Sequence, residues 1–206
     1  MKLNPCIRSL FALAIQTALF AQPAQQVKSE ALSNAVVLII RHAEKSRAGQ
    51  ELSVAGYARA KAYVDYFSNY QVDGQPLKLD YIVAAMDAKT SHKGHPREAP
   101  YPRLTVEPLG HALGLAIDTR FNDREFRHLA EEIQTVPHGK AILVACHHEG
   151  IPPLLHALGA APDQVLPAGS WPALVFDWVI QLRFDDQGRL LEAKRIGEKL
   201  MPGDAD

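Results

Sequence analysis

Three short, unbroken runs of apolar residues constrain the fold of this 206-residue chain more than any other feature. They are Ala35–Ile40 (AVVLII), Tyr81–Ala85 (YIVAA) and Ala141–Cys146 (AILVAC). A run without alternating polar residues is typical of a strand that is buried on both faces. Segments with helical spacing separate the runs, so the sequence predicts a mostly parallel sheet with helices packed on both of its faces.

The remaining segments complete this predicted architecture. Helices are predicted over Ser53–Phe67, Val106–Leu115, Asp123–Ile133 and Pro152–Leu158. Near the C-terminus, Val175–Phe184 and Leu190–Ile196 are predicted strands, joined by the turn Asp185–Gly188. Residues 86–103 are rich in Lys, His, Pro, Ser and Arg and are interpreted as a loop. The predicted fold class is α/β: a three-layer α/β/α sandwich with a mostly parallel central sheet that ends in a β-hairpin.

The N-terminal segment has the three parts of a secretory signal peptide. Lys2 and Arg8 provide a charged start, and Ser9–Ala21 (SLFALAIQTALFA) is a short apolar run that ends in a small residue. This run is too short to span a bilayer, which takes about 20 apolar residues. We therefore predict a signal peptide over residues 1–21.

The rest of the chain is predicted to consist of a polar linker over residues 22–34 and one domain over residues 35–200. Cleavage after Ala21 would deliver a periplasmic or secreted protein without a membrane span. Two alternatives are an uncleaved anchor and an N-terminal helix that belongs to the fold.

Composition excludes several classes of function. The chain is 47% hydrophobic and 22% charged, as expected of a globular domain. Its net charge of -1 argues against nucleic-acid binding, which requires a basic surface. Its two cysteines cannot build a disulfide framework. Nine histidines are the one unusual count, because imidazole titrates near neutrality, binds metals and acts as a nucleophile.

Basic and imidazole side chains follow each of the three predicted strands. Arg41 and His42 follow the first strand, the loop 86–103 follows the second, and His147 follows the third. Because ligands bind outside the carboxyl ends of such strands, we expect these segments to line one cleft. Arg grips phosphate oxygens, and a neutral imidazole is a competent nucleophile at phosphorus. Phosphoryl transfer needs little beyond positioning and charge stabilisation, so we predict phosphoryl chemistry without a metal or cofactor.

Four segments resemble, in order, the motifs of the histidine phosphatase superfamily, which includes the phosphoglycerate mutases and acid phosphatases. LIIRHAEKS resembles the Arg-His-Gly motif that follows the first strand, with Ala43 in the glycine position. ELSVAGYARAKAYVDYF resembles the Leu-Ser-x-x-Gly-x-x-Gln/Arg-Ala segment of the family. LTVEPLGHALGL resembles the helix after the second Arg, and VACHHEGIPPLLHALG resembles the strand, second His and helix near the C-terminus. The resemblance implies a phosphoglycerate-mutase-like fold.

The resemblance also implies roles for individual residues. His42 matches the histidine that becomes phosphorylated, and Arg41 matches the phosphate-binding arginine beside it. His147 matches the second histidine, which contacts the same phosphoryl group and stabilises its charge.

Two further roles have several candidates each. The second phosphate-binding cation is sought among Arg103, Arg97 and Lys89, with Arg103 favoured. The carboxylic acid that protonates the leaving oxygen is sought among Glu149, Glu125 and Asp87, with Glu149 favoured. A metal site built from His92, His95, His147 and His148 is disfavoured, because the sequence contains no tight zinc spacing.

Together these features predict a metal-independent phosphatase, which hydrolyses small phosphate monoesters through a phosphohistidine on His42. The alternative is a protein of the same fold that binds a phosphorylated ligand without turning it over.

Overall fold

The computed structural model describes residues 32–47, 50–86, 90–92, 95–97, 100–122 and 124–204. The predicted signal peptide and most of the predicted linker lie outside the described residues. So do the candidates Asp87 and Lys89, and the side chain of Arg97.

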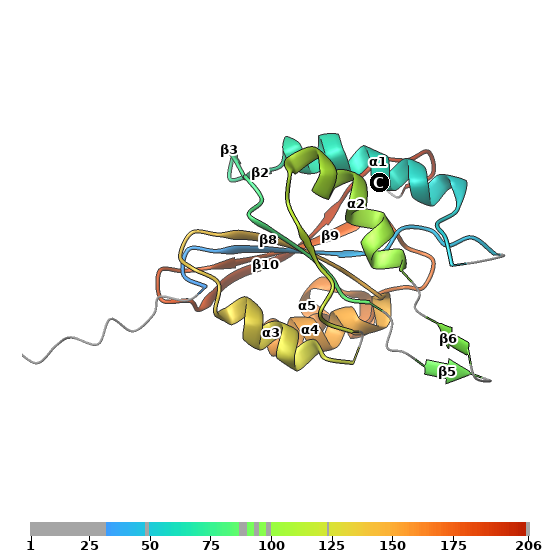
Figure 1. Ribbon diagram of the computed structural model, residues 1–206. Helices are drawn as coiled ribbons and strands as arrows, with labels where there is room; N and C mark the ends of the chain where they lie inside the picture. Colours follow the sequence, from blue (N-terminus) through green and yellow to red (C-terminus); the bar gives the residue numbers. More distant parts are fainter. Residues whose placement is uncertain are drawn as a thin grey trace, which may run out of the picture.

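A six-stranded sheet forms the middle layer (Figure 1). Its strand order is β10-β9-β1-β8-β4-β7. Four of its members run parallel to one another: β1 (Val36–Arg41), β8 (Ala141–Cys146), β4 (Tyr81–Ala84) and β7 (Ile117–Asp118). The C-terminal hairpin adds β9 (Trp178–Phe184), antiparallel to β1, and β10 (Leu190–Gly197), antiparallel to β9.

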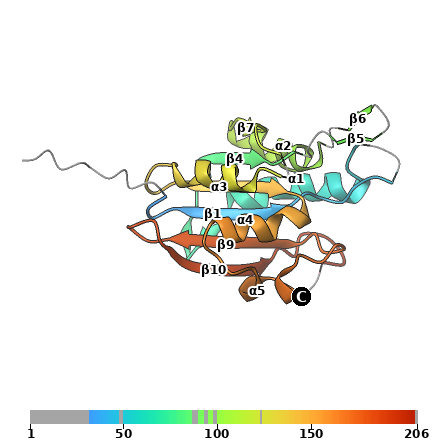
Figure 2. The same ribbon diagram turned by 90° about the horizontal axis from the view of Figure 1, so that it is seen from below.

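Helices cover both faces of this sheet, as Figures 1 and 2 show. One face carries α1 (Val54–Ser68) and α2 (Tyr101–Leu113). The other carries α3 (Phe126–Gln134), α4 (Ile151–Ala157) and α5 (Pro162–Val165). Single 3-10 turns lie at η1 (His148–Gly150) and η2 (Pro167–Gly169).

The burial of β1 explains why its sequence is apolar from Val36 to Ile40. Val37 and Ile39 pack in the hydrophobic cluster on the α3 and α4 side, whereas Leu38 and Ile40 pack in the cluster on the α1 and α2 side. Successive side chains of a strand point to opposite faces, so a strand between two helical layers has no position for a polar residue. The predicted three-layer sandwich with a mostly parallel sheet is confirmed.

The interpretation of residues 86–103 as a plain loop was wrong in two places. Within it, β5 (Thr90–His92) pairs antiparallel with β6 (His95–Arg97). Helix α2 begins at Tyr101 rather than Val106, and Pro102 lies in its first turn. Proline is tolerated there because the N–H groups of a helix's first turn have no partner within the helix.

Other element bounds also differ from the sequence prediction. Helix α3 begins at Phe126 rather than Asp123, and β9 begins at Trp178 rather than Val175. The two-residue strands β2 (Gln71–Val72), β3 (Gln75–Pro76) and β7 were not predicted, because two residues are too few to display a period.

The described fold extends beyond both of the predicted domain limits, residues 35 and 200. Leu32 is buried, and its backbone N–H donates to the carbonyl of Val136 at 2.8 Å. At the other end, Asp204 pairs with Arg59 of α1. In the part of the chain that the structure describes, no helix is long and apolar enough to cross a membrane.

Candidate active site

His42 and His147 meet at the carboxyl edge of the sheet, one residue beyond the ends of adjacent parallel strands. Arg41 of β1 is in register with Cys146 of β8, and the N–H of His42 donates to the carbonyl of Cys146 at 2.9 Å. The two imidazole rings lie edge to face with their centroids 4.7 Å apart. The strand-end rule therefore predicted this pairing correctly.

The local contacts of His42 define which of its nitrogens carries the proton. The ring is fully buried, and its Nδ1 lies 2.7 Å from the carbonyl oxygen of Ala43. A carbonyl only accepts hydrogen bonds, so Nδ1 holds the hydrogen and Nε2 holds a lone pair. Burial, reinforced by the nearby His147, lowers the pKa of His42 to about 2, so the ring is neutral at physiological pH. Nε2 has no hydrogen-bond partner among the described residues.

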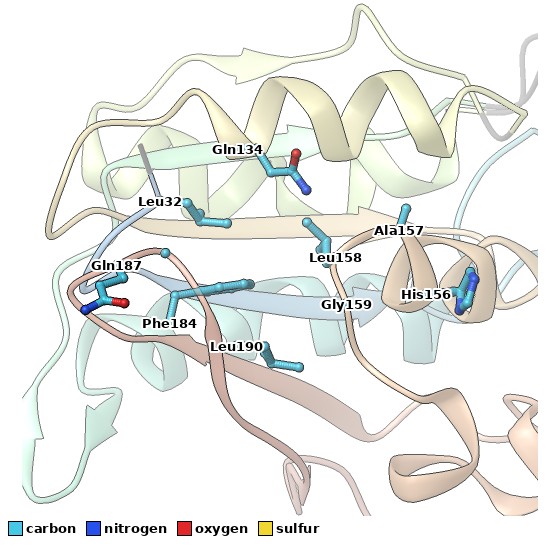
Figure 3. A pocket seen from close by; sticks show the side chains of 10 residues that line it. Leu32, Gln134, His156, Ala157, Leu158, Gly159, Phe184, Gln187 and Leu190 are labelled. Atoms are coloured by element: carbon cyan, nitrogen blue, oxygen red, sulfur yellow. The ribbon is translucent and has the colours of Figure 1, made fainter. Parts of the chain in front are cut away.

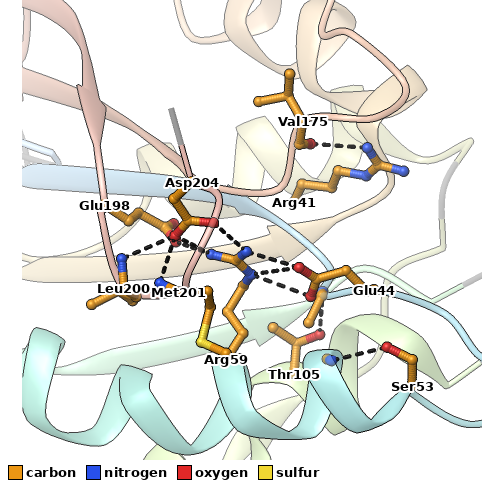
Figure 4. Close-up of polar contacts among 12 residues, drawn as sticks. Arg41, Glu44, Ser53, Arg59, Thr105, Val175, Glu198, Leu200, Met201 and Asp204 are labelled. Carbon is orange, nitrogen blue, oxygen red and sulfur yellow. Dashed lines mark hydrogen bonds and ion pairs between the residues drawn. The ribbon is translucent and has the colours of Figure 1, made fainter. Parts of the chain in front are cut away.

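Arg41 lies beside His42 and is anchored on one side of its guanidinium. Nη1 donates to the carbonyl of Val175 at 2.9 Å (Figure 4). It also donates to the carbonyl of Ala173 at 2.6 Å. The guanidinium carbon lies 3.8 Å from the centre of the Phe176 ring. Burial lowers the pKa of Arg41 to about 10, which leaves the group charged at neutral pH. Its buried Nε has no partner within the described part of the chain.

The first turn of α2 forms another wall of the site. The ring centroid of Tyr101 lies 5.5 Å from that of His42, and Lys45 places its Nζ 4.5 Å from the centre of the Tyr101 ring. The hydroxyl of Thr105 accepts from the N–H of Ala43 and donates to the carbonyl of Tyr101, both at 2.8 Å. These bonds tie α2 to the segment that follows β1.

Comparison with known proteins gives the fold a context. No protein-family model matches the chain, and no curated protein matches its sequence. Among solved structures, phosphoglycerate mutase from Plasmodium falciparum is 14% identical, with a TM-score of 0.50 over 84% of this chain and 98% of its own. The protein has the phosphoglycerate-mutase-like fold. The resemblance predicted from the sequence motifs is thus confirmed at the level of the fold.

Two further structures are similar over most of their length. The putative phosphohistidine phosphatase SixA from Agrobacterium tumefaciens is 18% identical, with a TM-score of 0.48 over 78% of this chain and 97% of its own. The protein histidine phosphatase SixA complexed with tungstate is 14% identical, with a TM-score of 0.45 over 79% of this chain and 97% of its own. At such identities, the roles of individual residues rest on the geometry of this chain.

In this phosphoglycerate-mutase-like domain, the favoured second cation is already paired with a carboxylate of its own helix. Arg103 is half-buried on α2, where its guanidinium pairs with Glu107 one turn later. No described contact joins Arg103 to His42 or Arg41. Lys45 occupies the position near Tyr101 instead. Sequence reasoning missed Lys45, although it follows Arg41 and His42 within the same short motif.

The two described candidates for the proton donor, Glu149 and Glu125, each precede a residue of one close contact, that between Gly150 and Phe126. Glu149 is exposed in η1, two residues after His147. Glu125 precedes α3, and its Oε2 accepts from the N–H of Asn122 at 3.0 Å. Between them, the ring of Phe126 packs against Gly150 so closely that a Cβ on Gly150 would lie 1.9 Å from it. The beginning of α3 is thereby fixed beside the turn that carries His147.

A separate cavity of about 640 Å³ lies at the opposite end of β1 (Figure 3). It is bordered by Leu32, which precedes β1, and by Phe184 at the end of β9. His156 is the one titratable side chain among its described lining residues. Its described lining therefore holds no cluster of catalytic side chains, unlike the region around His42.

Proposed function

We propose that the protein is a metal-independent phosphatase, which hydrolyses phosphate monoesters through a phosphohistidine on His42. One observation carries the proposal: two adjacent buried side chains, Arg41 and His42, each hold a nitrogen without a partner among the described residues. A buried polar atom left without a partner costs about 1–3 kcal/mol, so such a pair favours a ligand that satisfies both. A phosphoryl group does so, because its oxygen accepts the N–H of Arg41 and its phosphorus accepts the lone pair of His42.

The geometry supports a two-step reaction. In the first step, Nε2 of His42 attacks phosphorus, a P–N bond forms and the P–O bond to the leaving alcohol breaks. Nδ1 keeps its hydrogen throughout and donates it to Ala43, which stabilises the positive charge that the ring acquires. Glu149 protonates the leaving oxygen, with Glu125 as the alternative donor.

In the second step, water attacks the phosphorus of the phosphohistidine. The P–N bond breaks, inorganic phosphate leaves, and the carboxylate that gave up its proton takes one from the water. Arg41 and His147 stabilise the charge on the equatorial oxygens in both steps.

We propose Lys45 rather than Arg103 as the second cation that binds the phosphoryl oxygens. Lys45→Ala is expected to raise KM for a phosphate monoester about 10-fold, the value of one hydrogen bond to a charged group. Arg103→Ala is expected to change KM less than about twofold, because Arg103 already pairs with Glu107 on α2. Steady-state kinetics of both variants test the assignment, and the reverse order of effects would contradict it.

The substrate class and location follow from the same site and from the N-terminal segment. We propose that the substrate is a small phosphorylated molecule, and that the protein acts in the periplasm or outside the cell. The signal-peptide pattern in residues 1–21 supports this location.

The experiment that tests the proposed function is rapid-quench trapping of the phosphoenzyme. The protein is mixed with p-nitrophenyl phosphate, with and without EDTA, quenched in alkali and digested for mass spectrometry. We expect nitrophenol release that EDTA does not reduce, and an acid-labile phosphate on His42. Phosphate on another residue would refute the role of His42, and loss of activity in EDTA would refute the metal-free mechanism. Absence of both release and label over a broad pH range and a panel of monoesters would favour the alternative, a protein that only binds a phosphorylated ligand.

A further inference from the structure

The chain beyond β10 turns back and contacts the middle of α1. Arg59 of α1 is almost fully buried, with 2% of its surface exposed. Asp204 meets it with two oxygens, at 2.7 Å from Nη2 and 2.9 Å from Nη1 (Figure 4). Asp204 also accepts from the N–H groups of Leu200 and Met201, both at 2.9 Å, which fixes the carboxylate within its own segment.

The other side of the same guanidinium donates hydrogen bonds to the carboxylate of Glu44. Nη2 of Arg59 lies 2.8 Å from Oε1 of Glu44, and Nε lies 3.1 and 3.2 Å from the two carboxylate oxygens. The backbone of Glu44 is fixed as well, because its carbonyl accepts from the N–H of Ser53 at 2.8 Å. Glu44 is thus connected to the C-terminal segment through one planar group that bonds to both carboxylates.

Glu44 is bonded to the peptide unit that orients His42. The carbonyl of Ala43, which accepts from Nδ1 of His42, belongs to the peptide that joins Ala43 to Glu44. Rotation of that peptide would remove the acceptor from Nδ1, and Nε2 could then hold the hydrogen instead of the lone pair. An imidazole protonated at Nε2 cannot attack phosphorus with that atom.

We infer that Asp204 is a positioning residue of the active site, which acts through Arg59 and Glu44 to hold the carbonyl that selects the tautomer of His42. This inference rests on the proposed role of His42 as the nucleophile.

The composition of the cluster supports a positioning role. Buried ion pairs contribute little net stability compared with apolar residues of similar size, and in some proteins they instead specify a single conformation. Here Glu198 is a third carboxylate, 3.5 Å from Arg59, and accepts from the hydroxyl of Tyr63 at 2.9 Å. Burial raises the pKa of Glu198 to about 8, so at pH 7 it is mostly protonated, which leaves Glu44 and Asp204 to share the charge of Arg59.

The test compares Asp204→Asn with Asp186→Asn, the same chemical change at an exposed acid in the C-terminal hairpin. For Asp204→Asn we expect kcat to fall about 10-fold or more with KM within about twofold, because small displacements of reacting groups cost that much. Two-dimensional NMR of the imidazole nitrogens is expected to show a larger fraction of His42 with its hydrogen on Nε2. Asp186→Asn should leave both readouts unchanged, and Asp204→Glu should restore part of kcat.

Each outcome supports or overturns the inference. A folded Asp204→Asn variant with wild-type kcat and an unchanged His42 spectrum would overturn it. If Asp204→Asn does not fold, Glu44→Gln replaces it, because that variant leaves the contact between Asp204 and Arg59 intact and must show the same His42 signature. If the wild-type protein hydrolyses no monoester, the proposed function fails, while the NMR comparison still decides whether Asp204 sets the tautomer.

Discussion

Replacement of His42 by alanine is expected to lower phosphate release by about 10⁴-fold or more, the scale of loss when an enzyme's nucleophile is removed. The side chain that would form the P–N bond is then absent, and no other described group occupies its position between Arg41 and His147. We expect the variant to remain folded, because the loss of one hydrogen bond to Ala43 is accompanied by removal of a buried nitrogen that lacks a partner.

The matched control for this variant is His148→Ala. His148 is the next residue after His147 and is half-buried, and burial, followed by the charge of Arg41, lowers its pKa. We assign it no bond to the substrate, so its removal should reduce kcat/KM less than about fivefold, below 1 kcal/mol. Residual activity of His42→Ala comparable with that of His148→Ala would rule out covalent catalysis by His42. Both activities are measured on one monoester after circular dichroism confirms the fold.

Gly56→Ala is expected to destabilise the protein by about 3 kcal/mol, although the change places a better helix former in α1. A Cβ on Gly56 would lie 2.3 Å from the backbone carbonyl oxygen of Glu44. Backbone cannot move aside as a side chain can, and this backbone is held by the N–H of Ser53 and by the adjacent contacts of His42. The variant must therefore displace the start of α1 or the segment after β1.

Urea unfolding of Gly56→Ala and Ala58→Gly separates the clash with Glu44 from the helix preference of alanine over glycine. Both variants exchange glycine and alanine within α1. Ala58 is exposed, so its change to glycine should cost only the helix preference, about 1 kcal/mol. Helix preference alone would make Gly56→Ala more stable than the wild type by up to about 1 kcal/mol. A gain of that sign would show that the approach of α1 to Glu44 is looser than the structure indicates. We also expect reduced phosphatase activity in the folded fraction, because Glu44 follows the segment that carries His42.

The sheet and the pairing of two histidines were predictable because each depends on a local pattern. A central strand must be apolar wherever helices cover both of its faces, as β1 is from Val36 to Ile40. Parallel strands also bring the residues after their ends together. His42 and His147 could be paired by this rule without knowledge of any contact.

The surroundings of those histidines were not predictable, because they depend on contacts between distant segments. The carbonyls that hold Arg41 belong to Ala173 and Val175. The sequence pattern predicted a strand from Val175 onward and no regular structure at Ala173. Asp204 meets Arg59 across 145 residues of sequence, and a single acid near the C-terminus carries no periodicity that would indicate a partner. The contact between Tyr101 and His42 could not be predicted either, because the first turn of α2 was predicted as a loop.

The anchoring of Arg41 has a consequence for ligand affinity. An arginine on an open surface gives up the freedom of several rotatable bonds when it binds an anion, which subtracts about 0.5–1.5 kcal/mol from binding. Arg41 gives up that freedom when the chain folds, because Ala173, Val175 and Phe176 already hold its guanidinium. The entropy lost on binding is correspondingly smaller, because the guanidinium of Arg41 is preorganised for a phosphate group.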